Sequence, residues 1–346
     1  MALEVDIEKR AGNFHLKAAF EAEAGILGIL GASGCGKSMT LKCVAGIERP
    51  DRGRVALDGR TLFDSERKID LPPQRRRVGY LFQNYALFPG MTVRQNLLCG
   101  LHAEKDKRAR EARADEMLEL LQIQHLAPLK PRALSGGQAQ LVALGRILVN
   151  APDVLMMDEP FSALDAHLRL KLQMALRELL SRYGKSVIMV THDRDEAFRM
   201  CDRLGVMENG RMLAVRPTKA LFQDPGTRAA AAITGCKNIA GARKSGEYEV
   251  FVPEWNVRLK TAKPVGDNVS AVGVRAHDFR PEIESNRFPV RFGREMEEPF
   301  AWVSEFRYEG QAPESPPVWW RYAREARPDE VPKAMGVAPE DVLLLY

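Results

Sequence analysis

The segment Gly31–Ser38, with the sequence GASGCGKS, constrains the fold more than any other part of this chain. It fits the pattern G-x-x-x-x-G-K-[ST], follows the apolar run Gly25–Leu30 and precedes a stretch with helical spacing. Glycines let the backbone curl so that its N–H groups face a phosphate, and the helix adds the partial positive charge of its N-terminus. A chance glycine-rich turn rarely has a strand before it and a helix after it, so we predict a phosphate-binding loop.

Within such a loop, Lys37 reaches the β and γ phosphates of a nucleotide, and the Ser38 hydroxyl binds Mg²⁺. The sequence therefore predicts a nucleotide and Mg²⁺ as cofactors. The predicted nucleotide-binding residues of this segment are Gly31, Ala32, Ser33, Gly34, Cys35, Gly36, Lys37, Ser38 and Met39.

Apolar runs without polar alternation predict parallel strands that are covered on both faces. They are Gly25–Leu30, Val78–Phe82, Val154–Met157 and Ser186–Val190. Apolar residues in 166–183 have helical spacing, and Gly184 ends that helix. Asn209-Gly210 predicts a hairpin turn. The fold class we expect is α/β, a P-loop ATPase domain with a mixed sheet.

A change of composition after about Gly235 predicts a domain boundary, because prolines and aromatic residues become common and helical spacing fades. We expect a nucleotide-binding domain at 1–235 and a small, mostly β accessory domain at 236–346. Within the first domain, the charged helical stretch 103–126 belongs to a predicted helical subdomain at about 84–135.

An apolar strand that ends in two carboxylates follows at Val154–Glu159. Asp158 is placed to hold Mg²⁺ through water, and Glu159 to polarise an attacking water as general base. A strand that ends in Asp-Glu is common, so this pattern gains its meaning from the phosphate-binding loop that precedes it.

A second helix start with anion-binding character lies at Ser135-Gly136-Gly137-Gln138, before an apolar helical pattern. One interpretation is a serine that caps a helix after a flexible entry. The other is a phosphate-binding turn that acts across a dimer. One chain with one phosphate-binding loop has no need of a second such turn, whereas two chains facing head to tail do.

The bulk composition excludes several classes of protein. A formal charge of +5, spread along 346 residues, gives no clustered basic face for nucleic acid. The apolar runs are too short to cross a bilayer, and because Glu4, Asp6 and Glu8 interrupt the first residues we expect no signal peptide there and expect a membrane role to require a partner. The five cysteines are scattered without a C-x-x-C pair, which is typical of a reducing compartment.

Together these motifs resemble, in family order, those of the nucleotide-binding subunits of ABC transporters over residues 1–235. The resemblance identifies Gly31–Ser38 as Walker A, Val154–Glu159 as Walker B and Leu134–Gln138 as the family signature. It adds the Q-loop glutamine Gln83, which contacts Mg²⁺ and the attacking water, the D-loop aspartate Asp165 at the dimer seam, and the switch histidine His192, which bonds the γ-phosphate. A helix-capping aspartate remains an alternative for Asp165.

The resemblance also implies ATP hydrolysis by a pair of chains on the cytoplasmic face of the membrane, beneath permease subunits that a solute-binding protein serves. Family members stack adenine on an aromatic side chain upstream of Walker A, and Phe14 is the nearest candidate, with a core phenylalanine as the alternative. The stretches 158–169 (DEPFSALDAHLR) and 84–89 (NYALFP) resemble importers, and 71–80 (LPPQRRRVGY) is similar to importer ATPases of the molybdate type. Sulfate, ferric iron and sugar importers have similar subunits. A soluble ABC ATPase that acts on DNA or ribosomes is the remaining alternative.

Overall fold

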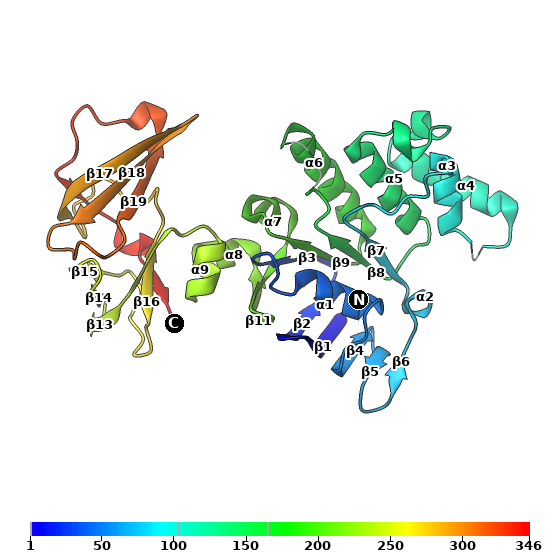
Figure 1. Ribbon diagram of the computed structural model, residues 1–346, viewed down its shortest axis with the longest axis horizontal. Coiled ribbons are helices and arrows are strands. Elements are labelled where there is room, and N and C mark those ends of the chain that lie inside the picture. The colour runs from blue at the N-terminus through cyan, green and yellow to red at the C-terminus, as the bar shows by residue number, and fades with distance from the viewer. Residues whose placement is uncertain (1, 103, 163, 165) are drawn as a thin grey trace. The chain divides into compact units, whose positions relative to one another are not determined.

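The computed structural model describes residues 2–102, 104–162, 164 and 166–346, with the backbone alone at 166–168 (Figure 1). The chain divides into two compact units, Met1–Thr218 and Lys219–Tyr346. Among the residues described, no helix is both long enough and apolar enough to span a bilayer.

Unit 1 is built on one mixed sheet of 11 strands in the order β6-β5-β4-β1-β2-β11-β10-β3-β9-β8-β7. Its strands are β1 (Leu3–Ala11), β2 (Phe14–Ala22), β3 (Gly25–Leu30), β4 (Arg52–Leu57), β5 (Arg60–Asp64), β6 (Ile69–Asp70), β7 (Val78–Leu81), β8 (Val154–Asp158), β9 (Ser186–Thr191), β10 (Arg203–Glu208) and β11 (Arg211–Pro217). Strands β3, β9, β8 and β7 pair in parallel, and β1 pairs antiparallel with β2 and β4.

Burial along the strands follows the sequence pattern. Every residue of β8 and β9 is buried, as uninterrupted apolar runs require of central parallel strands. In β1, by contrast, Leu3, Val5 and Ile7 point into the core and the residues between them face solvent. These strands, with the β10–β11 hairpin whose turn residues Asn209 and Gly210 both have positive φ, confirm the predicted α/β class with a mixed sheet.

The helices of unit 1 fall into those beside the sheet and a helical group at one end of the unit (Figure 1). They are α1 (Lys37–Ala45), α2 (Pro73–Arg76), α3 (Val93–Gly100), α4 (Lys107–Leu120), α5 (Gly136–Leu148), α6 (Ala166–Tyr183) and α7 (Arg194–Met200), with 3₁₀ turns η1 (Gln124–Leu126) and η2 (Pro131–Ala133). Helices α3, α4 and α5 share an apolar cluster that includes Leu97, Leu118 and Val142. Leu172, Leu176 and Leu180 are buried at four-residue spacing, which confirms the predicted helix at 166–183.

A fully buried arginine ties the first helix to the sheet. Arg76, with no exposed surface, donates to the backbone oxygens of Cys43 and Val44 at 3.0 and 2.8 Å and to Asp70 at 2.9 Å. The guanidinium thereby satisfies the last carbonyls of α1 and lies against Gly46, where a Cβ would approach within 2.5 Å of its Nε. Since α1 begins at the phosphate-binding loop, this contact fixes the far end of the helix that carries the loop.

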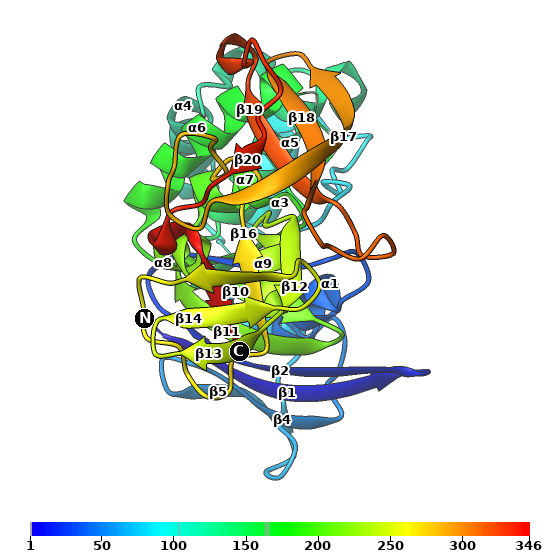
Figure 2. The same cartoon turned by 90° about the vertical axis from the view of Figure 1, so that its left-hand side faces the viewer.

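Unit 2 contains three small sheets, in the orders β12-β16-β21, β13-β14-β15 and β19-β18-β17-β20. In both views, β17–β19 lie at one end of this unit and β13–β14 at the other (Figure 2). Its elements are α8 (Thr218–Gln223), which begins at the division, α9 (Arg228–Ile233), β12 (Asn238–Gly241), β13 (Arg243–Gly246), β14 (Glu249–Val252), β15 (Val257–Lys260), β16 (Ala271–Val274), β17 (Phe288–Glu298), β18 (Ala301–Tyr308), β19 (Val318–Ala323), β20 (Ala334–Met335) and β21 (Leu343–Leu345), with turns η3 (Arg324–Ala326) and η4 (Pro339–Asp341).

The structural division at residue 218 lies upstream of the boundary expected near 235. Residues 219–235 pack with unit 2 because Ala231 of α9 joins an apolar cluster with Cys236, Ala271 and Leu345. Arg275 reinforces this packing by donating to the backbone oxygen of Thr234 at 2.9 Å.

Candidate nucleotide-binding site

The loop Gly31–Ser38 joins β3 to α1. Gly34 and Gly36 have φ angles of +80° and +106°, a left-handed conformation that residues with a Cβ rarely adopt. At Gly31, a Cβ would lie 2.3 Å from the backbone oxygen of Met207. Backbone geometry therefore requires the glycines of the motif, and the loop leads directly into the N-terminus of α1, where unpaired N–H groups favour an anion.

The side chain of Lys37 folds back over this loop. Its Nζ donates to the backbone oxygens of Gly31 and Ala32 at 2.8 and 2.9 Å, and the residue is only 5% exposed. The ammonium group is thus held above the loop, where a phosphate bound by the loop would meet it. Cys35 is buried beneath the loop, and burial raises the pKa of its thiol, so the thiol stays neutral.

The carboxylate of Asp158, at the end of β8, has a hydroxyl donor for each of its oxygens. Ser38 donates to Oδ1 at 2.7 Å, and Tyr80 of β7 donates to Oδ2 at 2.9 Å. Burial and the neighbouring carboxylate raise the pKa of Tyr80, so its hydroxyl remains protonated and able to donate. Ser38 and Asp158 together present the hard oxygen atoms that Mg²⁺ prefers.

Glu159 follows at once and has an unusual backbone. Its φ is +46°, and its N–H donates to the backbone oxygen of Val190 at 3.1 Å. The Oε1 of Glu159 lies 3.2 Å from Nδ1 of His192, whose side chain is 54% exposed. A left-handed conformation at a non-glycine residue costs energy and is found most often at functional sites.

Gln83 lies just beyond the end of β7 and is exposed. Its Nε2 donates to the hydroxyl of Ser162 at 3.2 Å, and that hydroxyl donates to the backbone oxygen of Glu159 at 3.0 Å. The amide is therefore linked through one serine to the backbone that carries Glu159.

Sheet register explains why these residues meet. Strands β3, β9, β8 and β7 are parallel neighbours, and Leu30 pairs with Thr191 while Asp158 pairs with Val190. The carboxyl ends of all of them therefore reach the same edge of the sheet, which is where ligands bind in open α/β sheets. This edge brings together Ser38, Gln83, Asp158, Glu159 and His192.

The segment Ser135–Gln138 forms the start of α5 as a capping box. Gln138 N–H donates to Ser135 Oγ at 3.3 Å, and Ser135 N–H donates to Gln138 Oε1 at 2.9 Å. Ser135 and Gly136 are exposed, whereas Gly137 is buried. Within the described part of the chain, no hydrogen bond or ion pair joins this turn to Gly31–Ser38.

The remaining predicted residues differ in what the structure says of them. Phe14 begins β2 and packs partly buried against the core, with its ring beside the loop: a Cβ at Gly36 would lie 3.1 Å from Cζ of Phe14. Met39 also packs partly buried against that core. Asp165 lies outside the described residues.

Tyr80 is a site residue that the sequence analysis did not name. Its hydroxyl reaches Asp158 because Tyr80 pairs with Met156 across the parallel strands β7 and β8. The available signal was its place three residues before Gln83 in a strand otherwise apolar.

The fold and the loop define this protein as a P-loop nucleotide-binding protein. The sequence profile of the family described as "ABC transporter" matches residues 18–162. The molybdenum import ATP-binding protein ModC of Paramagnetospirillum magneticum is 40% identical over 226 residues, 65% of this chain and 62% of that protein. The spermidine/putrescine import ATP-binding protein PotA of Pseudomonas fluorescens is 42% identical over 258 residues, 73% of this chain and 69% of that protein.

Solved structures agree with these relatives. The cassette MJ0796, in a dimeric post-hydrolysis state with ADP and Pi, has a TM-score of 0.53 and 27% identity over 63% of this chain and 99% of that one. CbiO1 of Clostridium perfringens, part of the transporter complex cbiONQ, has a TM-score of 0.56 and 28% identity over 64% of this chain and 90% of that one. The chain therefore belongs to the ABC transporter family, and the two relatives are named as import ATP-binding proteins.

The hydrogen bond from the Tyr80 hydroxyl to Asp158 can be tested by substitution. In Tyr80→Phe, Oδ2 of the buried Asp158 carboxylate loses its donor, so we expect unfolding to require about 1.5–3 kcal/mol less free energy. Urea denaturation followed by far-ultraviolet circular dichroism measures this change. Tyr85→Phe is the matched control, because the buried Tyr85 hydroxyl has no hydrogen-bond partner among the described residues and its removal is expected to be neutral or stabilising. Equal stability losses in both variants would contradict a specific Tyr80–Asp158 bond.

Proposed function

We propose that this chain is the ATP-hydrolysing subunit of an ABC importer and that two copies act together beneath a membrane permease. The observation that carries the proposal is the meeting of Ser38, Asp158, Glu159 and His192 at the edge of the sheet where the phosphate-binding loop begins. A loop that can anchor phosphates, a carboxylate that can hold a metal and a candidate base, all at one edge, are the parts that phosphoryl transfer to water requires.

The proposed roles follow from position and chemistry. The loop amides and Lys37 hold the phosphates of ATP. Mg²⁺ would be held by Ser38, Gln83 and Asp158, and when bound it would neutralise charge on the phosphates. Glu159 accepts the proton of the attacking water, and His192, 3.2 Å from it, orients that carboxylate and bonds the γ-phosphate.

The same site requires a second copy of the chain. The turn Ser135–Gln138 lies at a helix start with Ser135 and Gly136 exposed, and it has no hydrogen bond to its own phosphate-binding loop in the described residues. We infer that it closes over the γ-phosphate held by the partner chain, with Asp165 at the seam and Phe14 against adenine. The similar cassette MJ0796, whose solved structure is a dimer, supports this arrangement.

The substitution Glu159→Gln tests the mechanism. The amide keeps the size of the carboxylate but accepts no proton, so we expect the hydrolysis rate to fall by about 10²–10⁴. ATP binding should persist, because Glu159 is not among the groups that hold the phosphates. The variant should then accumulate as an ATP-bound dimer, which size-exclusion chromatography with Mg-ATP would detect.

Glu116→Gln, a substitution of an exposed glutamate on α4, is the control for this experiment. It should hydrolyse ATP and elute as the unmodified protein does. Hydrolysis at the unmodified rate in Glu159→Gln would remove Glu159 from the role of base. A variant that binds ATP without dimerising would contradict the two-chain site.

The permease contact is proposed to run through the segment after Gln83. The Asn96 side chain bonds both the N–H and the carbonyl of Phe88, at 2.9 and 3.2 Å, which fixes the backbone while Phe88 as a whole residue is 47% exposed. Met91 is also exposed, so this segment offers apolar surface on a rigid support. Such a contact would hold the subunit at the cytoplasmic face of the membrane.

Phe88→Glu is expected to lower transport tenfold or more in the assembled complex while leaving ATP hydrolysis by the isolated subunit within about twofold, since a charge disrupts an apolar contact. Uptake of labelled solute by vesicles, beside ATPase assays, measures both quantities. Leu120→Glu on α4 is the matched control, because Leu120 is similarly exposed at 49% but lies off this segment. Full transport by Phe88→Glu would refute the proposed contact.

Two chemical classes of solute, oxyanions and polyamines, are the main candidates for transport. The sequence resemblance favours molybdate or a related oxyanion, with sulfate, ferric iron and sugar as alternatives. The match to the polyamine ATPase extends further along the chain than the match to the molybdenum ATPase, 73% against 65%, which supports a polyamine as second candidate. In the reconstituted complex, we expect molybdate with its binding protein to stimulate ATP hydrolysis. Stimulation by putrescine alone would transfer the proposal to polyamines, and association with ribosomes or DNA would overturn import.

A further inference from the structure

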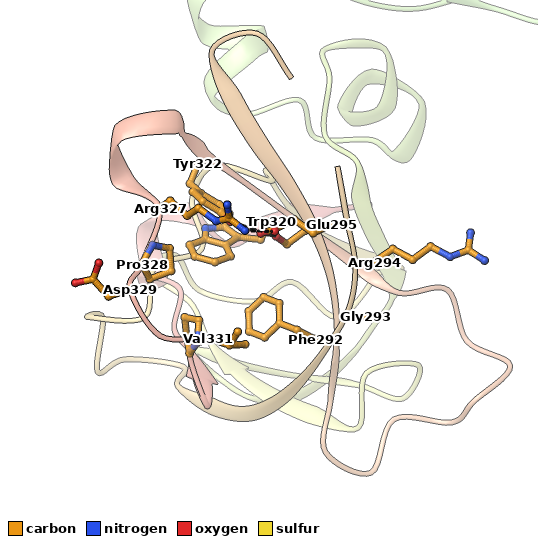
Figure 3. Close-up of a pocket in the computed structure, with 12 residues that line it drawn as sticks. Phe292, Gly293, Arg294, Glu295, Trp320, Tyr322, Arg327, Pro328, Asp329 and Val331 are labelled. Atoms are coloured by element: carbon orange, nitrogen blue, oxygen red, sulfur yellow. Dashed lines mark hydrogen bonds and ion pairs between the residues drawn. The ribbon is translucent and has the colours of Figure 1, made fainter. Parts of the chain in front are cut away.

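Unit 2 contains a pocket of its own on the sheet β19-β18-β17, beneath the segment 324–333 that leads to β20 (Figure 3). Its cavity of about 320 Å³ lies within the range of small-molecule sites. Phe292 and Trp320 face the cavity from the sheet, and Pro328 and Val331 border it from the segment. The pocket is therefore an apolar slot between aromatic side chains and a connecting loop.

One carboxylate lies at the polar end of this slot. A bulge in β17 between Phe292 and Glu295 shifts the register against β18. Oε1 of Glu295 accepts from the hydroxyls of Tyr322 at 2.7 Å and Ser304 at 3.2 Å, and Ser304 is only 3% exposed. Both donors are neutral, so they orient the carboxylate and leave its negative charge to be balanced by a cation.

The cation that balances it comes from the connecting segment. Arg327 donates to Oε2 of Glu295 at 2.7 Å, and its guanidinium carbon lies 4.0 Å from the ring centroid of Trp302. A carboxylate beside an aromatic face is the environment that binds organic cations. The guanidinium of Arg327 thus occupies the cation position beside Glu295. Because the Arg327 side chain is 51% exposed, its ion pair contributes little stability.

We propose that this pocket binds a small organic cation, with a primary ammonium or guanidinium group on a short apolar chain, in place of Arg327. The charged group of the ligand would take the Glu295 oxygen, and its chain would lie against Phe292 and Trp320. Of the other charged residues that line the pocket, Arg294 points away from it and Asp329 lies at its outer side (Figure 3). With Arg327 displaced, the site carries negative charge, which disfavours an oxyanion.

Intrinsic fluorescence suits the test, because the four tryptophans, Trp255, Trp302, Trp319 and Trp320, all lie in unit 2. We would titrate the full-length protein, without nucleotide, with n-butylguanidinium and n-butylammonium chlorides, using sodium butyrate and sodium chloride as controls. Both cations should change the fluorescence saturably, and the two controls should not. Saturable binding of butyrate would overturn the assignment of charge.

The proposal predicts opposite changes in cation affinity for two substitutions. Arg327→Ala removes the tethered competitor and should tighten cation binding about fivefold or more, whereas Glu295→Gln should weaken it at least tenfold. Glu297→Gln is the matched control, because Glu297 lies on the same strand and pairs with Arg324 outside the pocket. Thermal melting checks that each variant is folded. Unchanged or weaker binding by Arg327→Ala, or unmodified affinity in Glu295→Gln, would overturn the proposal.

Discussion

The candidate nucleotide site depends on how the carboxylate of Asp158 is held. Its oxygens accept from Ser38, which belongs to the helix after the loop, and from Tyr80, on the neighbouring strand. Asp158 itself ends a strand in which every residue is buried. Three chain segments therefore converge on one carboxylate, and the buried Arg76 fixes the opposite end of the helix that carries Ser38. Displacing Ser38 or Tyr80 would take one of the two donors from a buried carboxylate, which is costly.

The features of the fold and the site that could be predicted from the sequence are those that appear as local sequence patterns. The loop Gly31–Ser38 and the uninterrupted apolar strands are short contiguous signals, and the structure has them within a residue or two of the expected bounds. Strands β1 and β2 were missed, although Leu3, Val5 and Ile7 alternate, because β1 pairs with β4 and β2 with β11, which lie further along the chain. Tyr80 was missed for a related reason: only the parallel pairing of β7 with β8 brings it to Asp158.

The position of the boundary between the two units could not be predicted from amino-acid composition, for a different reason. Segments 218–223 (TKALFQ) and 228–233 (RAAAAI) are helical, as much of unit 1 is, so residue types alone offered no reason to separate them from it. Their packing is decided by Ala231 against Ala271 and Leu345, and by Arg275, which donates to the backbone at Thr234. Ala271 and Leu345 lie on β16 and β21 and Arg275 directly follows β16, so these partners are distant in the sequence from α8 and α9 and cannot be recognised from local residue types.

The conformation of Glu159 connects the sheet to the proposed chemistry. Its φ of +46° is imposed by its surroundings, because its N–H continues the β8–β9 ladder to Val190 while its carbonyl accepts from Ser162. The backbone hydrogen bonds of Glu159, and not contacts of its carboxylate, therefore determine the position and direction from which its side chain extends. A change confined to that side chain leaves these bonds intact, so its effect on hydrolysis can be assigned to proton transfer. The strained backbone of Glu159 is thus held in place by the most buried strands of the sheet. A general base needs such rigid placement.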